Sequence, residues 1–119
     1  MGLLHVSRIS LVASACVCAC AIAMLGTASA VPPRTISITI NAMSFASPER
    51  AVKVGDTVEW LNKDVVAHTA TEKDAGLWDV TLAPGETRKA VMKRAGRFDY
   101  YCRLHPNMKA TLVVERAAK

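Results

Sequence analysis

Alternating apolar and polar residues run through the chain after residue 30 and predict β-strands. Ile36, Ile38 and Ile40 alternate with Ser and Thr, a pattern typical of a strand with one buried face. Similar short extended segments are expected at 51–54, 57–62, 68–71, 86–93, 98–102 and 109–115, with a weak one at 77–82. Turn signals separate them, and no segment of this part has convincing helical periodicity. Seven or eight short strands at this spacing predict an all-β sandwich or barrel.

The first 30 residues have a different composition, that of a secretory signal peptide. They contain a short start with Arg8 and no acid, an almost wholly apolar stretch at 9–25, and the small residues Ala28-Ser29-Ala30 of an A-x-A cleavage site. We therefore predict a cleaved leader at 1–30 and a single domain at 31–119. The alternatives are an uncleaved membrane anchor and a lipoprotein lipidated at Cys16.

Removing the leader leaves a small, moderately basic domain with one thiol. Its 14 basic and 10 acidic residues give a net charge of +4. The charges are interspersed, without the basic stripe of a nucleic-acid binder, and the positive balance favours acidic partner surfaces. Cys102 is the only remaining cysteine, so no internal disulfide can form. Metal ligation explains an unpaired cysteine in a small exported domain.

Potential metal ligands are concentrated near the C-terminus. Cys102, His105 and Met108 form the pattern C-x-x-H-x-x-M on an expected loop between two strands. His68 is the only other histidine after the leader, and we expect it to reach the loop from a distant strand and so tie the two sheets together. Two His, one Cys and a weak axial Met form a trigonal copper site. Each residue alone has an ordinary structural explanation, but together they predict copper.

A site of this kind indicates a one-electron carrier. The sequence shows no evident general base, nucleophile or substrate pocket, so we do not expect an enzyme. The alternative is a copper-binding or delivery protein without redox turnover, although the Met- or His-rich tracts common in such proteins are missing after the leader. A metal-free binding domain is a third possibility, and the complete ligand set argues against it.

Three segments carry a family resemblance. They are V-G-D-T-V-E-W at 54–60, A-P-G-E-T at 83–87 and A-G-R-F-D-Y-Y-C-R-L-H-P-N-M at 95–108. With them, the chain resembles the cupredoxin family of small blue copper proteins over nearly all of 31–119. The resemblance implies a Greek-key β-sandwich of seven to eight strands and one copper ion that alternates between Cu(I) and Cu(II). Only two residues separate His105 from Met108, which makes the chain most similar to the amicyanin branch.

Carried over to this sequence, the resemblance implies roles for individual residues. His68, Cys102 and His105 would be the strong ligands, and Met108 the long axial one. His105 would be the electron port within an apolar patch, for which the candidates are Leu104, Pro106, Met108 and Met43. Pro106 lacks an N–H group and cannot donate to the Cys102 sulfur, which favours a higher reduction potential.

The resemblance also implies a cellular setting. It predicts a periplasmic monomer that forms transient complexes with larger redox proteins. The electron donor would be an amine-oxidising quinoprotein dehydrogenase and the acceptor a c-type cytochrome. Neither nucleic acid nor stable membrane insertion after cleavage is expected.

Two residues depart from the family pattern. Thr69 stands where the family usually has an Asn that fastens the ligand loops, which predicts an altered clasp. Arg88 stands where an apolar inward residue is common, which leaves the register of the strand at 86–93 open.

Overall fold

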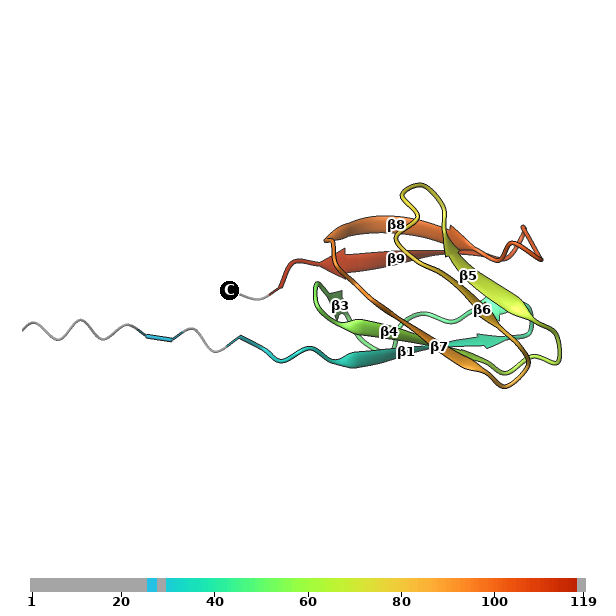
Figure 1. The fold of residues 1–119 in the computed structure, drawn as a ribbon, viewed down its shortest axis with the longest axis horizontal. Coiled ribbons are helices and arrows are strands. Elements are labelled where there is room, and N and C mark those ends of the chain that lie inside the picture. Colours follow the sequence, from blue (N-terminus) through green and yellow to red (C-terminus); the bar gives the residue numbers. More distant parts are fainter. Residues whose placement is uncertain (1–25, 28–29, 118–119) are drawn as a thin grey trace, which may run out of the picture.

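The computed structural model describes residues 26–27 and 30–117, which form a sandwich of two β-sheets (Figure 1). Most of the predicted leader lies outside the described residues. The strands are β1 (Thr35–Asn41), β2 (Ser44–Phe45), β3 (Val52–Lys53), β4 (Thr57–Asn62), β5 (His68–Glu72), β6 (Asp79–Leu82), β7 (Thr87–Val91), β8 (Gly96–Tyr101) and β9 (Lys109–Glu115). Residues 30–117 contain no helix, so no helix of the described chain is long and apolar enough to cross a membrane.

The two sheets are both mixed. The first has the strand order β2-β1-β4-β7 and the second the order β3-β9-β8-β5-β6. The pairs β1–β4 and β3–β9 are parallel, and the remaining pairs are antiparallel. The predicted all-β sandwich is confirmed. The described residues contain nine strands where seven or eight were expected, because the two-residue β2 is too short to show alternation.

The core lies between the inward faces of the sheets. Ile36, Ile38 and Ile40 are fully buried, as their alternation predicted. The ring centroids of Trp60 and Tyr100, which belong to opposite sheets, lie 6.1 Å apart. Burial raises the pKa of Tyr100 to about 12, despite an opposing effect from Trp60. The aromatic residues therefore join the two sheets through an apolar interior.

The strand expected at 86–93 is shorter in the structure, where β7 runs from Thr87 to Val91. Arg88 lies directly opposite Trp60, so its side chain starts on the inward side of β7. β7 is the edge strand of its sheet, and from there Arg88 extends to solvent and pairs with Glu86 at 3.0 Å. A long cationic side chain can leave an apolar face in this way. The sequence left the register of this strand open, and the structure shows that position 88 faces inward although its residue is charged.

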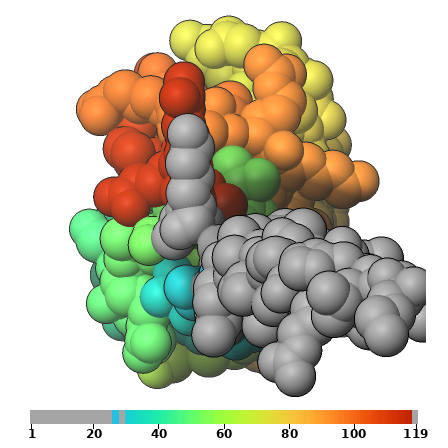
Figure 2. Space-filling model, turned by 90° about the vertical axis from the view of Figure 1, so that its left-hand side faces the viewer, coloured from blue at the N-terminus to red at the C-terminus, as the bar shows by residue number. Residues whose placement is uncertain are grey.

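The two ends of the sandwich differ. Residues 30–34, before β1, and residues 116–117, after β9, lie at one end of the sandwich, which faces the viewer in Figure 2. The β1–β2 turn, the β4–β5 loop and the β8–β9 loop lie together at the other end (Figure 1). This loop end carries the residues that the sequence analysis selected for metal binding.

Candidate metal centre

Three of the four predicted ligands converge at the loop end. His68 is the first residue of β5, Cys102 follows the last residue of β8, and His105 lies three residues further along the β8–β9 loop. One ligand atom from each lies within 4.8 Å of the others. His68 and Cys102 are fully buried, whereas His105 is partly exposed.

The expectation that His68 ties the two sheets together is wrong. β5 and β8 are neighbours in the same sheet, with Thr71 opposite Tyr101. His68 and Cys102 therefore come from adjacent strands, and their closeness follows from sheet pairing. The sequence did not indicate that the two strands are neighbours, because an alternating pattern predicts a strand but not the strand it pairs with.

Backbone hydrogen bonds fix the shape of the β8–β9 loop. The N–H of Cys102 donates to the carbonyl of Met108 at 3.0 Å, and the N–H of Met108 donates to the carbonyl of His105 at 2.8 Å. A weaker bond of 3.3 Å runs from the N–H of His105 to the carbonyl of Cys102. Met108 is buried beside the cluster, with 5% of its surface exposed. The loop thus has little freedom before any metal binds.

The thiol of Cys102 is surrounded by groups that favour its thiolate form. Its Sγ lies 3.8 Å from Nδ1 of His68 and 3.6 Å from Nδ1 of His105, and it accepts the N–H of Thr69 at 3.2 Å. Burial alone would raise the pKa of Cys102, but the N–H of Thr69 and the two imidazoles lower it to about 6. The thiolate is the form of cysteine that binds metals.

The ring of His68 presents its Nδ1 atom to the cluster because its other nitrogen is engaged. Nε2 lies 2.7 Å from Oδ2 of Asp64 in the β4–β5 loop. The N–H of Met43, together with His68 and the N–H of Ala42, holds the pKa of Asp64 below its usual range. A carboxylate partner keeps the proton on Nε2 and leaves the Nδ1 lone pair free for a metal. Two imidazole Nδ1 atoms and one thiolate suit copper.

Thr69 stands where the family usually has Asn, and it still connects β5 to the ligand loop. Its Oγ1 accepts the N–H of Arg103 at 2.7 Å, directly after Cys102, and lies 3.0 Å from Oγ1 of Thr71. Thr71 in turn donates to Asp79, which also binds the guanidinium of Arg103. The clasp is therefore altered in chemistry, as predicted, and extended into a network that links β5, β6 and the ligand loop.

An apolar face surrounds His105 at the surface. A shallow depression of about 440 Å³ is lined by Met43, Leu104, His105, Pro106, Asn107 and Met108. Met43 is 45% exposed and Leu104 54% exposed. The predicted patch residues, Met43 included, therefore share one depression with His105.

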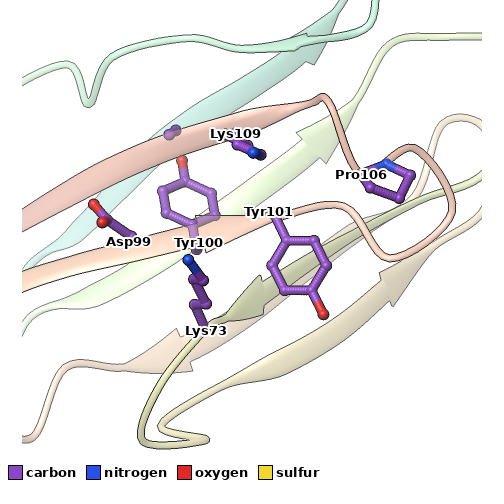
Figure 3. A pocket seen from close by; sticks show the side chains of 7 residues that line it. Lys73, Asp99, Tyr100, Tyr101, Pro106 and Lys109 are labelled. Atoms are coloured by element: carbon purple, nitrogen blue, oxygen red, sulfur yellow. The ribbon is translucent and has the colours of Figure 1, made fainter.

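A second groove, of about 390 Å³, shares Pro106 with this depression (Figure 3). It is lined by Lys73, Asp99, Tyr100, Tyr101, Pro106, Lys109 and Ala110. None of the predicted ligands lines it. Figure 3 shows Tyr101 and Pro106 at one end and Asp99 at the other. The groove therefore reaches the ligand loop at Pro106 without including any predicted ligand.

The fold and the donor set together define a blue copper type of protein. The sequence model of the cupredoxin-like domain matches residues 13–114, and the chain belongs to the cupredoxin family. The family-level function is that of a blue copper electron carrier, and copper, the predicted cofactor, is the metal that the family and the donor set indicate.

The similarity extends to individual proteins. Amicyanin of Paracoccus denitrificans is 32% identical over 93 residues, 74% of this chain and 71% of that protein. The methylamine utilization protein MauL of Methylorubrum extorquens is 31% identical over 72 residues, 58% of this chain and 63% of that protein. A solved structure of a proline variant of amicyanin in its oxidized state has a TM-score of 0.61 and 31% identity, covering 68% of this chain and 82% of that one.

Sequence reasoning missed Asp64. It follows the strand ending at Asn62 within a polar run that looks like any turn. Its one distinguishing signal is its position four residues before His68, and that spacing has meaning on a helix surface but not on a loop. The contact with His68 became visible only in the folded chain.

Proposed function

We propose that this protein is a periplasmic blue copper protein that carries single electrons between larger redox proteins. His68, Cys102 and His105 would be the strong ligands and Met108 the weak axial one. The observation that carries the proposal is the convergence of two imidazoles and one thiol, whose ligand atoms lie within 4.8 Å of one another. The proposed role is that of a carrier and involves no catalytic turnover of a substrate.

The protein's own residues would keep the site in one shape. When bound, copper supplies a one-electron couple between Cu(I) and Cu(II). The hydrogen-bonded loop between Cys102 and Met108 holds three of the proposed ligands in place, and the core excludes water from His68 and Cys102. Rigid ligands keep the reorganisation between oxidation states small, which favours fast electron transfer.

Electron exchange would take place at the His105 face. His105 is the one imidazole of the cluster that reaches the surface, and Leu104, Pro106 and Met43 supply apolar contact around it. An apolar rim of this size suits a transient complex, since it desolvates easily and holds few charges.

The leader-like segment and the relatives together support a proposed cellular setting. The segment at 1–30 would direct export, and the mature domain would work as a monomer. An amine-oxidising quinoprotein dehydrogenase is proposed as donor and a c-type cytochrome as acceptor. The similarity to amicyanin and to a methylamine utilization protein supports an amine-oxidising donor.

Optical spectroscopy and electrochemistry test the redox proposal. Purified domain 31–119 should turn intensely blue on addition of Cu(II), through thiolate-to-copper charge transfer, and bleach reversibly with a mild reductant. Cys102→Ser should abolish the colour, whereas Met108→Ala should shift the reduction potential and retain copper binding. A colourless copper complex, or one without a reversible couple, would instead support copper delivery without redox turnover.

A further inference from the structure

The β4–β5 loop places the carboxylate of Asp64 between the proposed metal ligands and the opposite sheet. The side chain of Asp64 is 12% exposed. The backbone N–H of Asp64 donates to Oδ1 of Asn62 at 3.0 Å, and Nδ2 of Asn62 donates to the carbonyl of Val66 at 2.8 Å. Asn62 is itself fully buried at the end of β4. The loop that carries Asp64 is therefore held from inside the sandwich.

Asp64 makes three hydrogen bonds to two different parts of the fold. Oδ2 lies 2.7 Å from Nε2 of His68 and accepts the N–H of Met43 at 3.0 Å. Oδ1 accepts the N–H of Ala42 at 2.7 Å. His68 belongs to the second sheet, whereas the turn at Ala42 and Met43 joins β1 to β2 in the first. One carboxylate thus connects the buried imidazole with the opposite sheet.

The β1–β2 turn has an unusual backbone that requires such support. Ala42 and Met43 have φ angles of 50° and 59°, in the left-handed region. Two-residue hairpin turns of this kind normally contain Asn and Gly, because a side chain costs about 1–2 kcal/mol per residue there. Charge-assisted hydrogen bonds from both N–H groups offset that cost. Met43 is thereby held in the depression around His105.

We infer that Asp64 is a positioning residue that orients the His68 ring and holds the Ala42–Met43 turn with the same carboxylate. The orientation of His68 and the position of Met43 at the edge of the apolar face would then both depend on the Asp64 carboxylate. This inference rests on the ligand role proposed for His68. It adds that the carboxylate favours Cu(II) over Cu(I), since a nearby negative charge stabilises the more positive ion.

The first test uses the metal-free domain and the variant Asp64→Asn. The amide has one acceptor oxygen, so either His68 or the turn must lose its partner. Nitrogen NMR should show His68 of the wild type with its proton on Nε2 and the variant with a mixture of tautomers. Amide hydrogen exchange at Ala42 and Met43 should become at least about tenfold faster. Asp74→Asn, which removes an exposed carboxylate from the β5–β6 connection, should change neither measurement.

The second test uses the copper-loaded protein. We expect Asp64→Asn to lower the preference for Cu(II) over Cu(I) by about tenfold, which raises the reduction potential by about 59 mV for one electron. Asp74→Asn should leave the potential unchanged. We also expect Asp64→Asn to lower the free energy of unfolding. Adding Ala42→Gly relieves the left-handed turn, so it should recover part of that free energy without restoring the reduction potential.

The possible outcomes separate this inference from the proposed function. Unchanged His68 tautomer and unchanged amide exchange in metal-free Asp64→Asn would overturn the positioning role, whatever the copper site does. An unchanged potential would overturn the electrostatic role. A wild-type domain that forms no blue site would contradict the proposed function, while the metal-free measurements would still decide whether Asp64 orients His68 and holds the turn.

Discussion

At the scale of single residues, the metal centre depends on groups that bind no metal themselves. Thr69 contributes twice: its N–H donates to Sγ of Cys102, and its Oγ1 accepts the N–H of Arg103. The first bond uses the backbone and survives any substitution except Pro. The second depends on the hydroxyl, and it fastens the residue after Cys102 to β5.

Removing that hydroxyl should loosen the ligand loop. Thr69→Val leaves the N–H of Arg103 without its partner, and we expect unfolding free energy to fall by about 1–3 kcal/mol. Urea unfolding of the metal-free protein measures this loss. Thr69→Ser keeps the hydroxyl and is the matched control. Equal stability of the Val and Ser variants would show that the clasp contributes nothing.

At the scale of elements, a turn at the opposite end fastens the N-terminal segment to the sandwich. Asp56 follows Gly55, whose φ of 94° suits a glycine, in the turn between β3 and β4. Its carboxylate accepts the N–H groups of Arg34 and Lys53, each at 2.9 Å, and pairs with the guanidinium of Arg34 at 2.9 Å. The segment before β1 is thus tied to the turn before β4, its parallel neighbour.

Acid should weaken this fastening. Burial alone would raise the pKa of Asp56, but Arg34 and the N–H of Lys53 lower it below the usual range. The unfolded chain binds this proton more readily, so the stabilisation is present above the ordinary Asp pKa of about 4 and is lost as pH falls through the lower folded value.

Asp56→Asn tests this pH dependence. At neutral pH we expect it to reduce unfolding free energy by about 1.5–3 kcal/mol, the contribution of hydrogen bonds to a charged group. The decline of stability in acid should also become shallower than in the wild type. Thermal unfolding of the metal-free protein across the acid range gives both quantities. A variant curve parallel to the wild-type curve would exclude Asp56 as the source of the slope.

At the scale of the whole molecule, the sandwich buries His68 and Cys102 at one end of the cluster and brings His105 to the surface at the other. His68 and Cys102 are fully buried, whereas His105 reaches a face with exposed Leu104 and Met43. That face carries none of the charged residues that flank the neighbouring groove, where Lys73 and Lys109 lie. Two such faces can meet without charge repulsion, which permits electron exchange between copies of the protein.

Placing a charge on the apolar face should slow that exchange. With copper bound, Leu104→Glu should reduce the electron self-exchange rate at low salt by at least about tenfold, because two like charges then meet in the encounter complex, and added salt should recover part of the rate. Val113→Glu introduces the same charge at an exposed position of β9 away from the face and should change the rate little. Line broadening in NMR spectra of mixed oxidation states measures the rate. Equal slowing by both variants would assign the effect to net charge.

The sequence by itself determined the alternating strands, the inward face of β1 and the C-x-x-H-x-x-M loop, because each is a local pattern with a local physical cause. It predicted which residues gather but not which strands are neighbours, so it placed His68 across the sandwich from Cys102 when pairing puts them on adjacent strands. The roles of Thr69 and Asp64 were decided only by the tertiary structure. Their partners, Arg103, Ala42 and Met43, are more than 20 residues away in the chain. Hydrogen bonds over such separations depend on how the sheets fold together, which no local pattern records.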